Sequence, residues 1–168
     1  MPEQLIQSGR IVADRWQRLE VSEDADLDAL SAAPILLPAS LWCARRDELL
    51  ARTGEIGVSL PPDFPLESLA GDIGRFSLIA VEFPKFADGR GYSTASLLRE
   101  RYAYRGELRA VGDVGRDQMF YLQRVGFNAF LIPEGRDAED ALQGLTDFPD
   151  TYQGAADQSL PLFRRRAI

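Results

Sequence analysis

The sequence of 168 residues contains no histidine and a single cysteine, Cys43. Without histidine there can be no Ser-His-Asp or Cys-His catalytic arrangement, and no imidazole to bind a metal or titrate near neutral pH. One cysteine excludes a disulfide within the chain and a cysteine-based zinc or iron–sulfur site. We therefore predict no metal site, and we expect Cys43 in the core rather than as a nucleophile.

Lysine is almost as scarce, because Lys85 is the one lysine among 19 basic residues. The formal net charge is −7 and the sequence pI is about 4.7, which argues against nucleic acid or an anionic membrane as the main partner. The chain also lacks a charged-then-apolar leader and a long apolar run. We therefore expect neither a signal peptide nor a membrane span, and a cytoplasmic location.

What remains is an ordinary globular composition, with 45% hydrophobic and 27% charged residues, so the length fits one domain with its own core. From Pro34 onward, short apolar runs alternate with segments of helical spacing. The apolar runs predict strands in residues 34–38, 56–60, 76–83, 107–114 and 127–132. The helical spacing predicts helices in residues 40–53, 93–104, 116–125 and 137–145.

Such alternation indicates βαβ units and a mostly parallel sheet in a single α/β domain over residues 1–168. The pattern leaves open whether the sheet is open and flavodoxin-like or a partial TIM-barrel-like one. We predict an N-terminal strand or hairpin within residues 1–33, a βα core in 34–145 and a loop-rich tail in 146–168. The acidic segment DADLDAL (24–30) is expected to be a loop or a short helix.

Helix ends are expected at particular residues. Ser40 and Gly54 should cap the first helix, Gly106 should end the second, and Gly126 should end the third.

Functional side chains are expected in the loops that follow the strands, because parallel α/β folds bind ligands at the carboxyl ends of their strands. These loops are PPD (61–63), PKFADGRGYS (84–93), GDVGRD (112–117) and PEGRD (133–137). All four contain aspartate, and three carry glycine next to arginine. The segment 85–124 also carries eight basic against five acidic side chains, which suits an anion or an acidic partner.

The DGRG turn lies just ahead of a predicted helix. Gly89 and Gly91 would allow a positive φ and a close approach, and the helix N–H groups favour an anion. Lys85 would add charge, and Arg90 could bind two oxygens at once. The alternative is a tight strand–helix turn with Arg90 solvated and Asp88 bonded to its own backbone. The third glycine of a dinucleotide fingerprint is missing, and no P-loop motif occurs.

In GDVGRD, Asp113 could act as an acid/base or anchor a ligand, and Arg116 could make a second anion contact. The alternative is that Asp113 or Asp117 caps the next helix. Lys85 and Asp113 are the candidates for a catalytic role. The predicted anion-binding residues are Lys85, Asp88, Gly89, Arg90, Gly91, Ser93, Asp113 and Arg116.

The stretch from FPKFADGRGYS to RVGFNAF (83–130) resembles the bacterial family catalogued as domain of unknown function 934. The resemblance extends from GRIVADRW near the start to PLFRRR at the end. The positions that match the family pattern are Lys85, Asp88, Gly89, Arg90, Gly91, Ser93, Arg99, Gly112, Asp113, Asp117, Gln118 and Gly126.

The resemblance implies a role in sulfite assimilation, because members of this family are typically encoded beside assimilatory sulfite reductase. They are commonly labelled probable oxidoreductases, and the resemblance carries over no catalytic residues. This sequence has no cluster ligands, no Rossmann fingerprint and no redox cysteine pair. A redox role would therefore need flavin or nicotinamide at an unrecognised site, or electrons from a partner.

We therefore predict an accessory protein of sulfite/sulfate assimilation without an evident cofactor. It would bind sulfite reductase or a small oxyanion through the Lys85/Arg90 and Asp113/Arg116 loops. One alternative is an enzyme that acts on an anionic small molecule at the same loops. A second alternative is a structural domain, and the sequence leaves homo-oligomerisation open.

Overall fold

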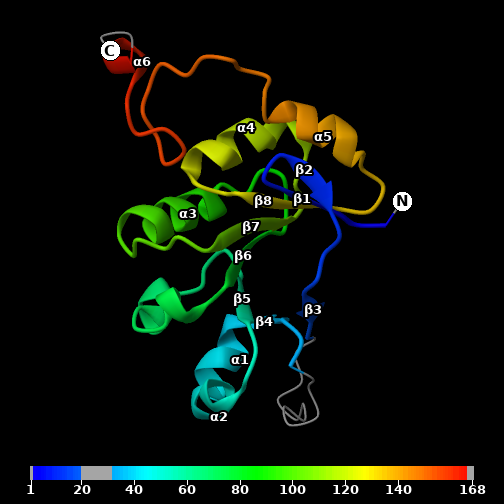
Figure 1. Cartoon of the computed structure of the whole chain (residues 1–168), viewed down its shortest axis with the longest axis vertical. Helices are drawn as coiled ribbons and strands as arrows, with labels where there is room; N and C mark the ends of the chain where they lie inside the picture. The colour runs from blue at the N-terminus through cyan, green and yellow to red at the C-terminus, as the bar shows by residue number, and fades with distance from the viewer. Residues whose placement is uncertain (1, 20–31, 166–168) are drawn as a thin grey trace.

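The structure is a computed structural model that describes residues 2–19 and 32–165 (Figure 1). Its strands are β1 (Gln4–Gln7), β2 (Arg10–Val12), β3 (Gln17–Arg18), β4 (Ile35–Pro38), β5 (Ile56–Leu60), β6 (Leu78–Phe83), β7 (Glu107–Gly112) and β8 (Ala129–Ile132). Its helices are α1 (Ala39–Ala44), α2 (Arg46–Ala51), α3 (Arg90–Glu100), α4 (Arg116–Val125), α5 (Ala138–Gly144) and α6 (Leu162–Arg165), with two short 3₁₀ helices at Leu66–Leu69 and Ile73–Arg75.

The strands form one sheet in the order β2-β1-β8-β7-β6-β5-β4-β3. From β3 to β8, neighbouring strands pair in parallel and follow the order of the sequence, whereas β1 pairs antiparallel with β8 and β2. The mostly parallel α/β sheet and the N-terminal hairpin are therefore confirmed. The sheet is open, with β2 and β3 at its edges within the described residues. Its unreversed strand order is that of a β/α barrel, since a flavodoxin-like sheet reverses direction at a switch point.

The unreversed order places the helices on one face of the sheet and the N-terminal segment on the other (Figure 1). On β6, Ile79 and Val81 belong to the core on the helix side, while Leu78 and Ala80 pack with Trp16 on the other side. Both sets are buried, as the near-continuous apolar run of this strand predicts.

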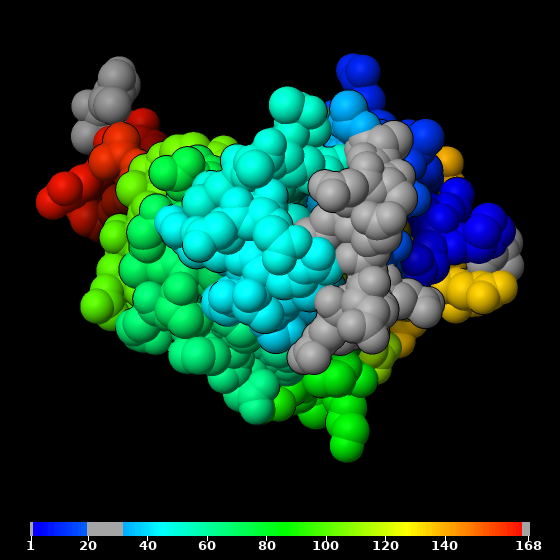
Figure 2. All heavy atoms as spheres, turned by 90° about the horizontal axis from the view of Figure 1, so that it is seen from below, coloured from blue at the N-terminus to red at the C-terminus, as the bar shows by residue number. Residues whose placement is uncertain are grey.

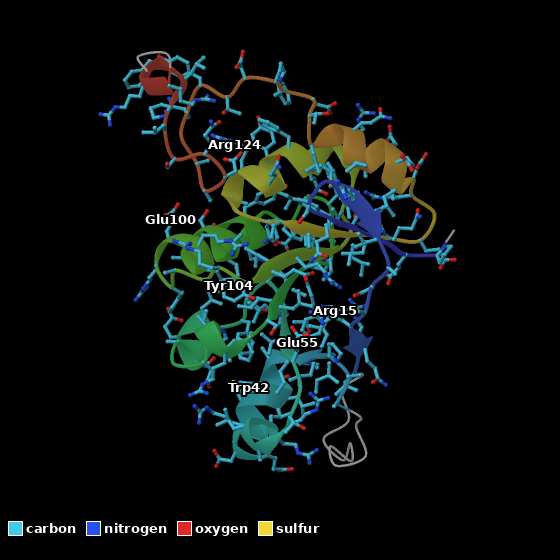
Figure 3. The ribbon with its side chains drawn as sticks, in the orientation of Figure 1. Arg15, Trp42, Glu55, Glu100, Tyr104 and Arg124 are labelled. Carbon is cyan, nitrogen blue, oxygen red and sulfur yellow. The ribbon has the colours of Figure 1, made fainter. Side chains whose placement is uncertain are left out.

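A buried arginine on β7 forms a salt bridge that connects the N-terminal segment to the sheet. Arg109 on β7 is 1% exposed, and its guanidinium binds Asp14 at 2.7 Å and Glu107 at 2.7 Å. Nearby, Arg15 pairs with Glu55, and Figure 3 shows the two side chains reaching toward each other. These contacts join residues that are far apart in the sequence. The acidic segment 24–30 lies outside the described residues.

The predicted helix 40–53 is divided in the structure into α1 and α2 at Arg45. The expectation that Cys43 lies in the core is wrong, because Cys43 in α1 is exposed. The break lets both helices contact the buried carboxylate of Asp72. Trp42 in α1 donates its indole N–H to Asp72 at 3.1 Å, and Arg46 in α2 donates two bonds to it at 2.6 and 2.7 Å. Arg46 is also the main cause that lowers the pKa of Asp72.

Some predicted helix ends also differ from the structure. Pro38, not Ser40, precedes the first turn of α1, and α2 ends before Gly54 is reached. Helix α3 ends at Glu100 rather than at Gly106 because Ala103 adopts a positive φ of 52° and turns the chain early. Gly126 does end α4, with a φ of 112°. In the described part of the chain, no helix has the length and apolar character to cross a membrane.

Candidate functional site

The loops after β6, β7 and β8 lie together, because these parallel strands end at the same edge of the sheet. We call residues 84–89, 113–115 and 133–137 the carboxyl-edge loops. Asp113 connects all three of them. Its carboxylate accepts the backbone N–H of Phe86 at 2.8 Å and pairs with Arg136. Its own backbone N–H donates to the carbonyl of Phe83 at 2.7 Å. The three loops are therefore one hydrogen-bonded unit.

Arg90 is engaged by its own loop. Its side chain donates to both carboxylate oxygens of Asp88, at 3.0 and 2.7 Å, and its backbone N–H donates to the same carboxylate at 3.1 Å. The guanidinium and then this backbone bond lower the pKa of Asp88 to about 2. The bidentate contact that we expected between the Arg90 guanidinium and a ligand is thus made with the carboxylate of Asp88, two residues earlier.

Lys85 differs from its neighbours. It is exposed, and among the described residues its ammonium group forms no hydrogen bond or salt bridge. Its backbone carbonyl accepts the N–H of Asp88 at 3.0 Å, so the backbone is held while the side chain is not. The charge of Lys85 is therefore available to a partner.

Phe86 is a residue that the sequence analysis missed. Its backbone N–H donates to Asp113, and its carbonyl accepts the side-chain amide of Gln118 at 3.2 Å. Its side chain nevertheless remains 51% exposed. In Figure 2 the bright green segment, which the colour bar places at this loop, projects from the lower rim of the molecule. Phe86 therefore combines a fixed backbone with an exposed side chain. In the sequence, the one local sign of this was the position of Phe86 shortly after Phe83, the last residue of β6.

Neither glycine of the DGRG turn has a positive φ, and only Gly91 is required for packing. Gly89 has a φ of −83° and open space around its Cα. Gly91 lies in the first turn of α3, where an added Cβ would come within 2.5 Å of the ring of Phe83. Ser93 is exposed on α3. The positive φ expected in this turn is thus absent, because α3 begins three residues earlier than predicted and takes both glycines into helical geometry.

Arg116 points away from the DGRG turn. It pairs with Asp140 of α5 at 2.6 Å and with Asp147 at 2.9 Å, and these contacts raise its pKa. The N-cap of α4 is Gly115, whose N–H donates to the side chain of Gln118 at 3.0 Å. Neither Asp113 nor Asp117 is the cap. Arg116, which was predicted to contact an anion, is therefore already paired with two carboxylates of the protein.

Two cavities open at this edge. One, of about 340 Å³ between the starts of α4 and α5, is lined by Phe86, Arg116 and Arg136 among others. The second, of about 430 Å³ on the face that carries the N-terminal segment, is lined by residues that include Arg18 and Glu82. Within the described residues, no group of three or more Asp, Glu or Cys side chains is placed to hold a metal ion.

The comparison with protein families shows the family of the chain. Residues 57–163 match a family of bacterial proteins of unknown function, domain of unknown function 934. The chain belongs to this family. The match spans β5 to α6 and includes every carboxyl-edge loop of this family member. A search of curated proteins finds no match.

In this family member most charged side chains of the carboxyl edge are paired with one another. The two candidates for catalysis are not paired with each other: Asp113 holds Phe86 and Arg136, while Lys85 extends into solvent. The arginines of the carboxyl edge are matched by carboxylates of the same molecule. Within the described part of these loops, the ammonium group of Lys85 forms no hydrogen bond or salt bridge, and Phe86 beside it is exposed.

Proposed function

We propose that this protein is an accessory protein of sulfite assimilation that docks on sulfite reductase. The docking element would be Lys85 and Phe86, which we call the carboxyl-edge tip. The link to sulfite reductase rests on the family resemblance. The observation that supports docking is the exposure of Phe86 on a loop whose backbone is already fixed at both its N–H and its carbonyl.

A fixed loop lowers the conformational entropy lost on binding. Interface energy is concentrated in a few aromatic and charged residues that enter pockets of the partner. Phe86 has the properties of such an anchor. Lys85 beside it would meet an acidic group of the partner, where complementary charge mainly accelerates association and fixes the orientation.

Docking is better supported than binding of a free oxyanion at the same loops. Arg90, Arg116 and Arg136 each bind at least one carboxylate of the protein. A small oxyanion would have to displace these carboxylates before it could use the guanidinium groups. A protein partner needs no such exchange, because among the described residues the Lys85 side chain has no hydrogen bond or salt bridge and Phe86 is exposed.

The test is a binding measurement between this protein and the sulfite reductase of the same organism, followed by a reductase assay with and without this protein. We expect the double variant Lys85→Ala/Phe86→Ala to lose binding by about tenfold or more, as for an interface anchor worth 1–2 kcal/mol or above. Phe163→Ala is the matched control, because Phe163 is 59% exposed and lies far along the chain on α6.

Wild-type protein that fails to bind the reductase would refute the proposal. Equal binding by the double variant and the wild type would clear the carboxyl-edge tip of this role. The circular dichroism spectrum and melting temperature of each variant should be compared first. The removed side chains are exposed, so a change of fold is not expected.

A further inference from the structure

A cavity larger than the two at the carboxyl edge lies at the opposite, amino edge of the sheet. Its volume is about 850 Å³, within the range of small-molecule sites. It lies between the turn after β1, the segments that precede β7 and β8, the end of α4, and the C-terminal segment (146–157). Figure 1 shows this last segment, in orange to red, running from α5 back across the end of α4. Its lining includes Arg99, Arg105, Gln123, Asn128, Phe130 and Leu145.

Arg99 lines this cavity, and no carboxylate of the described residues pairs with it. Its Nε donates to the carbonyl of Gly126 at 2.9 Å, and its Nη1 donates to the carbonyls of Tyr104 and Gly106 at 2.7 and 3.1 Å. These bonds fix the plane of the guanidinium and leave its Nη2 without an acceptor among the described residues. Burial, together with the nearby charge of Arg105, lowers the pKa of Arg99.

Arg105 adds a second cation to the same cavity. Its one hydrogen bond to the described part of the protein runs from Nη1 to the carbonyl of Arg99 and is long, at 3.3 Å. The acidic residue of the lining, Asp157, is already paired with Arg124 at 2.6 Å. Figure 3 places Arg124 close to the C-terminal segment that carries this aspartate. Two guanidinium groups of like charge therefore adjoin each other, and no carboxylate in the described ranges pairs with either of them, in a protein whose net charge is −7.

The remaining lining supplies an apolar wall and amide groups. Phe127 and Phe130 are buried at the back of the cavity, and Leu142 and Leu145 on the α5 side are half-buried. Gln123 contributes a side-chain amide at the end of α4. Apolar walls with a few convergent polar groups are typical of ligand sites, where the polar groups orient the ligand.

We propose that the amino-edge cavity binds an organic anion. Its oxyanion head, a carboxylate, phosphate or sulfate ester, lies against Arg99 and Arg105. Its apolar body lies against the phenylalanine and leucine wall. A guanidinium binds two oxygens of such a head side by side, and the bonds that Arg99 makes with backbone carbonyls hold it ready for that contact. This site is separate from the carboxyl-edge tip, so it does not depend on the docking proposal.

The experiment measures binding of phenyl phosphate, phenyl sulfate and phenylacetate to the full chain by calorimetry, with benzyl alcohol and inorganic phosphate alongside. We expect at least one of the three aromatic anions to bind saturably. We expect benzyl alcohol, which lacks the charge, and inorganic phosphate, which lacks the apolar body, to bind at least about tenfold more weakly. The order among the three anions identifies the head group.

The test variant is Arg105→Gln, because Arg105 is exposed and its loss should leave the fold intact. We expect it to weaken binding of the aromatic anion by about tenfold, the effect of one charge-assisted contact. Arg101→Gln is the matched control, since Arg101 is an exposed arginine at the end of α3 that does not line the cavity. Side-chain amide signals of Gln123 and Asn128 should shift in the NMR spectrum on binding.

Three results would overturn the proposal. None of the aromatic anions binds saturably, or benzyl alcohol binds as well as they do, or Arg105→Gln and Arg101→Gln weaken binding equally. The last result would mean that the anion responds to diffuse surface charge and not to this cavity.

Discussion

Replacing Gly91 with alanine should destabilise the protein, although alanine favours helices. An added Cβ would come within 2.5 Å of Cζ and 2.7 Å of Cε1 of Phe83. This ring is fully buried and is held between Tyr92, at a centroid distance of 5.6 Å, and Phe127, at 5.8 Å. Such overpacking of a core costs about 1–3 kcal/mol. This cost is offset in part, because alanine makes the unfolded chain less flexible and so stabilises the folded protein by about 0.4–1 kcal/mol.

The matched control is Gly89→Ala, two residues earlier. Gly89 has a φ of −83°, which alanine adopts readily, and no atom lies within 4 Å of the Cβ it would gain. It should receive the same entropic gain without the clash. Because Gly89 is the N-cap of α3, where alanine is less favourable than glycine, the two variants should differ by somewhat less than the overpacking term of about 1–3 kcal/mol. That difference corresponds to a melting temperature lower by on the order of 5 °C for Gly91→Ala.

Urea unfolding followed by tryptophan fluorescence and circular dichroism would measure the difference. If Gly91→Ala proves as stable as Gly89→Ala, the ring of Phe83 moves aside freely and the packing role of Gly91 is refuted. The double variant Phe83→Leu/Gly91→Ala gives a second check. It should cost less than the sum of its parts, because the smaller side chain makes room for the Cβ.

Three further predictions concern charged and polar groups. In NMR titrations, Asp88 should titrate near pH 2, and Arg90→Ala should return its pKa toward the ordinary value of about 3.9. Because the folded pKa is the lower one, the pair stabilises the fold above pH 4 and loses this effect as the pH falls toward 2. Arg109→Ala leaves two carboxylates without their buried cation and should cost about 3–5 kcal/mol in urea unfolding, whereas Arg101→Ala should change stability by under about 0.5 kcal/mol. Tyr104→Phe removes a buried hydroxyl that lies 3.1 Å from two backbone carbonyls and should cost about 1 kcal/mol, measured in the same way.

The central elements of the fold could be predicted from the sequence because their signals are local. The apolar run that forms β6 is buried on both faces, and the helical spacing of α4 ends at a glycine with a positive φ. Each feature is set by residues within about a dozen positions of one another. The parallel sheet then follows from the alternation of strands and helices.

Contacts between distant residues could not be predicted in the same way. Nothing near Arg109 in the sequence indicates that it is buried, because its partner Asp14 lies 95 positions earlier. The break between α1 and α2 likewise depends on Asp72, which is 26 positions from Arg46. At the candidate site, the sequence identified the charged residues but not that most of them pair with each other. Phe86 was missed because its exposure depends on Asp113 and Gln118 holding its backbone.

The pairing of β1 with β8 affects how the protein folds during synthesis. Gln4 pairs with Ile132 and Gln7 with Ala129, so β1 needs as its neighbour a strand that is made more than a hundred residues later, β8. At ribosomal rates of about 5–20 residues per second, β8 is synthesised on the order of ten seconds after β1. During that time the apolar Leu5 and Ile6, both buried in the finished sheet, are without their final neighbours. Shortening the chain before β8 should therefore expose Leu5 and Ile6 and promote aggregation.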